Sequence, residues 1–202
     1  MLFSIIQAAG WPVWPLIFAS IAAVALIVER FISLKRNKLL PKNLLDEVLN
    51  LHRNRQITPE IIQKLEANSA LGRVFATALR HELSTREIQK ESIEETGHAV
   101  AHGMGKYLST LGTIAAIAPL MGLFGTVVGM IEIFGSQAPS GTNPQLLAQG
   151  ISVALYNTAL GIVIAVPAMI FYRYFRARVE DYSVDMEQQA VRLVDILRGN
   201  RK

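Results

Sequence analysis

Two long, almost uncharged stretches dominate the pattern of hydrophobic and polar positions along the 202-residue chain. Residues 1–28 carry no charged side chain, and residues 107–172 carry only Glu132. Because a transmembrane helix needs about 20 mostly apolar residues, the first stretch predicts one span and the second predicts two, separated near residues 135–144. We therefore expect an all-α membrane protein with transmembrane helices at 11–32, 107–134 and 145–174.

The charged residues indicate which side of the membrane each connecting segment occupies. Of the 20 Lys and Arg, 13 lie in residues 30–106 and 7 in residues 173–202. Basic residues gather on the cytoplasmic side of membrane proteins. We expect a short outer N-terminus at 1–10, a cytoplasmic helical segment at 33–106, a short outer loop at 135–144 and a cytoplasmic C-terminal helix at 175–202.

Helix-start signals predict that the cytoplasmic segments are helices rather than an independent domain. Thr58-Pro59-Glu60 is one such signal, and residues 84–87 (STRE) form a capping box. Residues 84–134 contain no proline except Pro119, so we expect one helix of about 50 residues, about 75 Å long, running from the cytoplasm into the membrane. The third span continues without a breaker toward the C-terminus, which predicts a second very long helix.

Small residues recur every three or four positions in the second and third spans and form one small-residue face on each helix. Such faces let membrane helices approach closely. The pattern predicts tight packing within one chain, and it also fits a self-assembling ring of copies. The faces comprise Ala115, Ala118, Gly122, Gly125 and Gly129 in the second span, and Ala154, Thr158, Gly161, Ala165 and Ala168 in the third.

The few polar residues within the spans are the candidates for an ion path. Thr126 flanks the small-residue face of the second span, and Thr158 belongs to that of the third, with Asn157 beside it. A threonine hydroxyl often bonds only a carbonyl one turn back, but two of them on adjoining helices could line a polar path. Glu132, near the outer end of its span, either gathers protons there or is an interfacial residue bonded to the outer loop.

Other classes of function find little support in the sequence. Glu94, His98 and His102 share one helix face, but a structural zinc normally needs four ligands and the chain has no cysteine. We expect a solvated face there, and no metal. The basic residues are mixed with acidic ones, which does not indicate nucleic-acid binding. No Ser/His/Asp set, P-loop or dinucleotide fingerprint suggests an enzyme.

Two membrane segments resemble the signatures of the MotA/TolQ/ExbB proton-channel family. They are residues 118–131 (APLMGLFGTVVGMI) and 150–167 (GISVALYNTALGIVIAVP). Three spans with an outer N-terminus match the ExbB/TolQ branch, because the MotA branch has four. One position departs from the family: Val153 stands where many members carry Glu, so the predicted ring has no ionisable group in mid-membrane.

The resemblance implies a homopentameric ring in the bacterial inner membrane, with a periplasmic N-terminus, a cytoplasmic C-terminus and surrounding phospholipids. Its pore would hold the helices of an ExbD- or TolR-like one-span dimer, whose membrane Asp takes up and releases protons, the coupling ion. No other cofactor is implied. Work would pass to a TonB- or TolA-like periplasm-spanning protein. Thr126 and Thr158 occupy the pore-facing threonine positions of the family.

Several functions remain open at this stage. The first is an ExbB-type subunit that uses the proton-motive force to energise TonB-dependent outer-membrane transport. A second is a TolQ-like subunit of the Tol-Pal envelope system, and a third is a non-conducting scaffold for a one-span partner. A solute transporter acting alone is disfavoured, because neither inverted repeats nor an intramembrane charge is evident.

Overall fold

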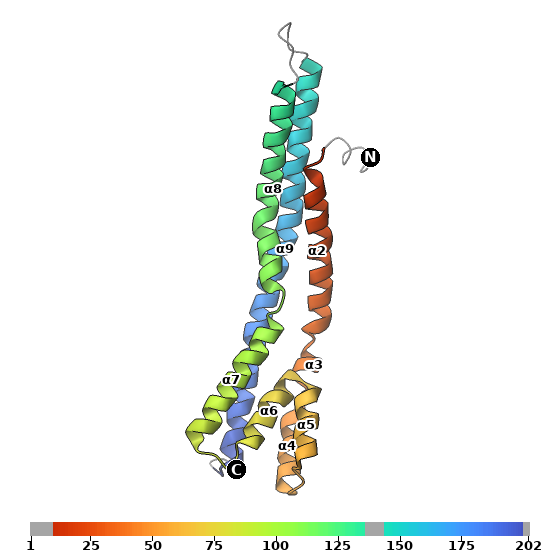
Figure 1. The fold of residues 1–202 in the computed structure, drawn as a ribbon. Helices are drawn as coiled ribbons and strands as arrows, with labels where there is room; N and C mark the ends of the chain where they lie inside the picture. The colour runs from red at the N-terminus through yellow and green to blue at the C-terminus, as the bar shows by residue number, and fades with distance from the viewer. Residues whose placement is uncertain (1–9, 136–143, 200–202) are drawn as a thin grey trace. The chain divides into compact units, whose positions relative to one another are not determined.

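The computed structural model describes residues 10–135 and 144–199, and within them every regular element is a helix. Most of the predicted N-terminal segment 1–10 and outer loop 135–144 lies outside the described residues. The helices, in chain order, are α2 (Val13–Ser33), α3 (Arg36–Leu39), α4 (Leu44–Arg53), α5 (Pro59–Asn68), α6 (Ala70–Arg80), α7 (Arg86–Met104), α8 (Leu108–Gly135) and α9 (Pro144–Leu197) (Figure 1).

The chain divides into two compact units. The first unit consists of residues 1–29 and 107–174, and the second of residues 30–106 and 175–202. Helices α2 and α9 contribute to both. The segments outside the spans are helical, as expected, and the second unit has a buried core of its own. Its most deeply buried apolar side chains include Val48, Leu71, Val74, Phe75, Phe175 and Leu193.

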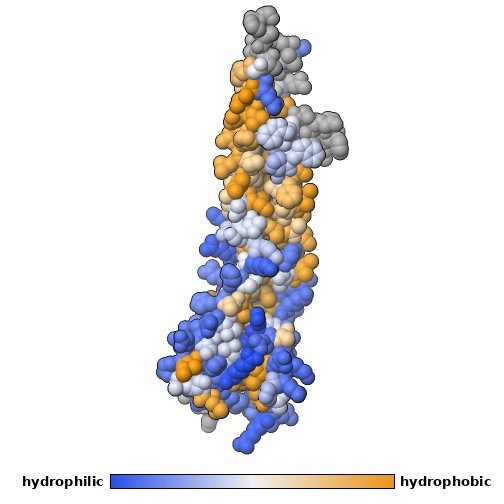
Figure 2. Space-filling model, in the orientation of Figure 1, coloured by the Kyte–Doolittle hydropathy of each residue, from blue (hydrophilic) through white to orange (hydrophobic). Residues whose placement is uncertain are grey.

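The first unit contains the membrane-spanning helices. Three helices are long and apolar enough to cross a membrane, Val13–Ser33, Leu108–Gly135 and Gly150–Leu197. Apolar side chains cover much of this unit's visible surface, whereas hydrophilic ones prevail over the second unit (Figure 2). On α2 the exposed residues include Trp14, Phe18 and Ile21. A surface of this kind is stable only against lipid or another apolar partner, and the chain is accordingly a multi-pass membrane protein.

Helix α2 packs onto the other two spans through a small apolar cluster. Leu16 of α2 is buried against Ala118 of α8 and Ala165 of α9. Just before α2 begins, the Trp11 ring meets the Phe124 ring edge to face, with ring centroids 6.1 Å apart. The three spans therefore share one core within the first unit.

The predicted unbroken helix over residues 84–134 is wrong. Helix α7 ends at Met104 with Gly105 as its C-cap, and Tyr107 has a left-handed φ of 65° before α8 begins. The Arg30 side chain is 4% exposed, and its Nη1 donates to the Met104 carbonyl at 2.9 Å. Arg30 thus satisfies one of the carbonyls that a helix end leaves unpaired. The shortage of proline did not keep the helix intact, because the backbone turns at Tyr107 and a tertiary contact from Arg30 holds the end of α7.

The predictions of the third-span helix and of the start of α5 are confirmed. The long helix expected through the third span is α9, which runs over 54 residues with Pro167 inside it. Thr58 caps α5 as expected, accepting a hydrogen bond from the Ile61 N–H at 3.4 Å. The N-cap of α7 is Thr85 rather than Ser84, and its N3 residue is Ile88 rather than Glu or Gln, so the predicted capping box is wrong.

Candidate functional site

The two small-residue faces lie against each other within one chain. All five small residues of α8 and the four Ala and Gly residues of the α9 face are buried. A Cβ atom on Gly161 would stand 2.6 Å from the Ala118 carbonyl oxygen, and one on Gly122 would stand 3.0 Å from the Thr158 Cα. The backbones of α8 and α9 therefore touch along a seam. Since this contact occupies the small-residue faces, copies of the chain would have to meet through other surfaces.

Asn157 lies inside this seam, opposite Gly125. Its side chain is 0% exposed, and its Nδ2 donates to the Val153 carbonyl at 3.5 Å. Asn157 is a predicted candidate for an ion path, and its amide lies between two tightly packed helices. A fully buried amide in a membrane span is costly unless its polar atoms form hydrogen bonds. The amide of Asn157 makes this part of the seam polar.

Thr158 carries a buried hydroxyl at the same level. Its Oγ1 is shielded from solvent and has no hydrogen-bond partner among the described residues. A Cβ atom on Gly122 would stand 3.0 Å from the Thr158 Cα. An unsatisfied buried polar group costs about 1–3 kcal/mol. This hydroxyl is therefore a buried polar group that is unsatisfied within the part of the chain that the structure describes.

Thr126 lies on a different part of the α8 surface. Its Oγ1 donates to the Leu123 carbonyl at 2.6 Å. The residue lines a shallow cavity of about 520 Å³ together with Val127, Met130, Ile131, Phe134 and Gly135. The two threonines thus differ: Thr126 is bonded to its own helix on an open face, whereas the Thr158 hydroxyl is unsatisfied in the seam.

The remaining candidates are exposed. Glu132 is exposed near the outer end of α8, and the loop to which it was expected to bond lies outside the described residues. Glu94, His98 and His102 are exposed on α7, and Glu94 pairs with Lys90 at 3.5 Å. Within the part of the chain that the structure describes, no three His, Asp or Glu side chains are placed to hold a metal ion.

Two buried polar residues of the second unit are not among the predicted site residues. One is Arg30, described above, and the other is Gln89 of α7, which is 0% exposed. Gln89 Nε2 donates to the Ala78 carbonyl at 2.8 Å, and its Oε1 accepts from Arg198 Nε at 2.9 Å. No local pattern marks these residues, because their partners are far away in sequence. Both side chains donate to carbonyls near helix ends.

Comparison with known proteins gives concordant matches. A model of the MotA/TolQ/ExbB proton channel family matches residues 66–188. The chain is 33% identical over 176 residues to a putative biopolymer transport protein ExbB-like 3 of Synechocystis, covering 85% of this chain and 83% of the relative. It is 32% identical over 168 residues to biopolymer transport protein exbB1 of Vibrio cholerae, covering 81% and 74%. It is 37% identical over 122 residues to ExbB of Salmonella typhimurium, covering 56% and 50%.

Proposed function

Because this chain belongs to the MotA/TolQ/ExbB proton channel family, we propose that it is the ring-forming subunit of an ExbB-type, proton-driven motor in the bacterial inner membrane. Its named relatives are ExbB-type biopolymer transport proteins, and the family is one of transport components rather than enzymes. In the proposed assembly five copies surround a pore, which holds the membrane helices of an ExbD- or TolR-like one-span dimer.

The unsatisfied hydroxyl of Thr158 carries the proposal. Residues 107–172 contain one ionisable carboxylate, Glu132, and it is exposed near the outer end of α8. Threonine donates and accepts hydrogen bonds but does not hold a transferred proton at neutral pH. The chain supplies a polar group that lacks a partner, and the proton-holding carboxylate comes from the one-span protein.

The open face of α8 suits a neighbouring helix in the pore. The cavity beside Thr126 is lined mainly by apolar side chains, including Val127, Ile131 and Phe134. A membrane helix that carries one carboxylate is otherwise apolar, so it can pack there with its carboxylate beside Thr126. Phospholipids would cover the exposed apolar residues of α2, such as Phe18.

The direction of work follows from the proposed topology. With the N-terminus periplasmic and the second unit cytoplasmic, proton entry through the complex drives a TonB-like protein that spans the periplasm and energises outer-membrane transport. A TolQ-like role in the Tol-Pal system differs only in the driven protein. A non-conducting scaffold is the alternative that lacks proton flux.

Purification from native membranes tests the proposal. We expect the chain to co-purify with a one-span protein that has an Asp in its span, and native mass spectrometry to show five copies of the chain. Deletion of the gene should abolish receptor-dependent uptake of iron chelates. A monomer without a one-span partner would contradict the proposal, and a Tol-Pal envelope defect with normal uptake would favour the TolQ-like role.

A further inference from the structure

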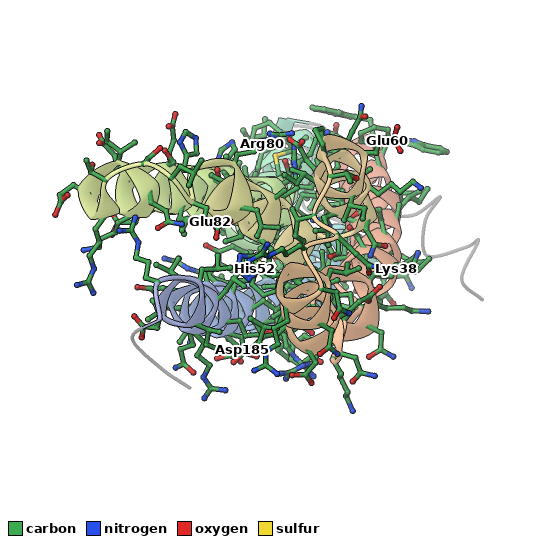
Figure 3. The ribbon with its side chains drawn as sticks, turned by 90° about the horizontal axis from the view of Figure 1, so that it is seen from below. Lys38, His52, Glu60, Arg80, Glu82 and Asp185 are labelled. Carbon is green, nitrogen blue, oxygen red and sulfur yellow. The ribbon has the colours of Figure 1, made fainter. Side chains whose placement is uncertain are left out.

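A groove of about 520 Å³ lies between α7 and α9 in the second unit. Its apolar lining residues, which we call its floor, are Ile93 of α7 with Ala190, Val191 and Val194 of α9. Val191 is 53% exposed, although apolar. Figure 3, which views the side chains from below, shows α7 in yellow-green and α9 in blue with side chains from both helices between them. The groove offers an apolar strip with no covering element in its own chain among the described residues.

The rim of this groove is charged and predominantly acidic. It comprises Arg86, Glu87, Lys90 and Glu94 from α7, and Glu187 and Asp195 from α9. Four carboxylates and two basic groups give the rim a formal charge of −2. Glu187 and Asp195 lie one turn before and one turn after Val191, so the apolar strip on α9 has a carboxylate at each end. Within the described residues, neither forms an ion pair with this chain.

We propose that the groove binds the cytoplasmic tail of the one-span partner through a short segment that is both basic and apolar. This inference rests on the proposed function, which supplies the partner and places the second unit in the cytoplasm. A one-span protein with its bulk outside carries Lys and Arg in the cytoplasmic tail next to its span. Such a tail complements both the acidic rim and the apolar floor.

The size of the groove favours a short tail over a second copy of this chain. From Arg86 to Glu94 the helix rises about 12 Å, which accommodates two or three side chains of a linear segment. A stable interface between folded proteins buries about 800 Å² on each partner, far more than this strip provides. A tail needs less affinity, because its own membrane helix keeps it at a high effective concentration.

The charges of α4 and α5 also disfavour the docking of either helix from a second copy. The exposed surface of α4 mixes Asp46 and Glu47 with Arg53, and that of α5 mixes Glu60 with Lys64. Neither helix presents a basic stripe. Docking either of them would bring carboxylates against the acidic rim, and like charges at close range oppose association.

Photo-crosslinking in the full complex tests the inference. The probe is p-benzoyl-phenylalanine placed at position 191 of the full-length chain, co-expressed with its one-span partner in native membranes. The control position is Gln63, which is exposed on α5 outside the groove. We expect position 191 to crosslink to the partner's cytoplasmic tail and position 63 not to do so. A crosslink from position 191 to a second copy of this chain, or no crosslink, would overturn the inference.

Charge reversal supplies the second measurement. The double substitution Glu187→Lys and Asp195→Lys should lower the crosslink yield from position 191 at least fivefold, while co-purification of the partner through its membrane helix persists. Replacing the Lys and Arg of the tail with Glu should restore the yield. Unchanged yield in the double variant overturns the docking site alone. Loss of the partner from the wild-type complex overturns the proposed function as well, so the two failures are distinguishable.

Discussion

Asn157 of α9 fills the space that Gly125 of α8 leaves open by having no side chain. A Cβ atom at position 125 would stand 2.7 Å from the Asn157 Cβ and 2.8 Å from its Cγ. Because Asn157 is also fully buried, the amide and the glycine fix the register of the two helices. The small-residue faces thus serve the fold of one chain, and the register they set also determines where Thr158 lies.

The first prediction concerns this contact. Gly125→Ala should lower the free energy of unfolding by about 1–3 kcal/mol, because the added methyl group overpacks the seam. Asn157→Ala in the same chain should recover part of the loss, since the two positions are in direct contact and their effects are coupled. Thermal unfolding of the four proteins of the double-mutant cycle in detergent measures both effects.

Gly97 provides the matched control for this cycle. A Cβ atom there would meet nothing within 4 Å, and the residue lies within α7. Gly97→Ala should leave the protein as stable or more stable by up to about 1 kcal/mol, because alanine favours a helix. Strictly additive effects at positions 125 and 157 would show that the two side chains do not compete for one space.

The second prediction separates stability from function at Thr158. Thr158→Val keeps the shape of the side chain and removes an unsatisfied buried hydroxyl, so the free energy of unfolding should stay the same or rise by about 1 kcal/mol. Energised uptake through outer-membrane receptors should nevertheless fall sharply at a normal protein level. Uptake assays and thermal unfolding of the same variant provide the two readouts.

Substitutions at two other threonines serve as controls for Thr158→Val. The Thr113 hydroxyl donates to the Ser109 carbonyl at 2.9 Å on an exposed face, so Thr113→Val should leave uptake unchanged. Thr126→Val should reduce uptake less than Thr158→Val, because the Thr126 hydroxyl is already bonded within its own helix. Equal loss at positions 113 and 158 would rule out a specific role for the seam hydroxyl.

The spans and their close packing were predictable from sequence, because membrane helices follow simple local rules of length and composition. Uncharged stretches of sequence predicted the positions of α2, α8 and α9. The three- and four-residue spacing of Gly and Ala predicted which faces of α8 and α9 form the seam. The spacing did not predict whether each small-residue face packs against a helix of the same chain or of another copy. The answer depends on which helices meet in the folded chain. The burial of Asn157 depends on the same contact.

The break between α7 and α8 was not predictable, because its cause is tertiary. A glycine at position 105 is compatible with a continuing helix, and a left-handed backbone at Tyr107 is unusual for any residue with a side chain. The buried contact from Arg30 to the Met104 carbonyl joins positions that are 74 residues apart. Likewise, the compact second unit depends on contacts between α7, α9 and the short helices that no local periodicity indicates.

The third prediction follows from the Arg30 contact. Arg30→Met should lower stability by about 2 kcal/mol, because it removes a charge-assisted hydrogen bond to a helix end. The amides of Gly105 and Lys106, which bond to the carbonyls of Ala101 and Gly103, should exchange with deuterium faster. Hydrogen-exchange mass spectrometry measures this, with Arg53→Met on the exposed face of α4 as control. Unchanged exchange at residues 105–106 would mean that Arg30 does not hold the end of α7.

In the proposed mechanism the ring supplies hydrogen bonds, and its partner supplies the proton-holding carboxylate. The most direct test reconstitutes the ring alone and the complete complex in liposomes and compares quenching of a trapped pH dye under an imposed potential. We predict that the ring alone is nearly proton-tight, because no Asp, Glu, Lys, Arg or His side chain of residues 107–172 lies at mid-span, and that flux appears with the complete complex. Sustained and equal flux through the ring without its partner would contradict this mechanism.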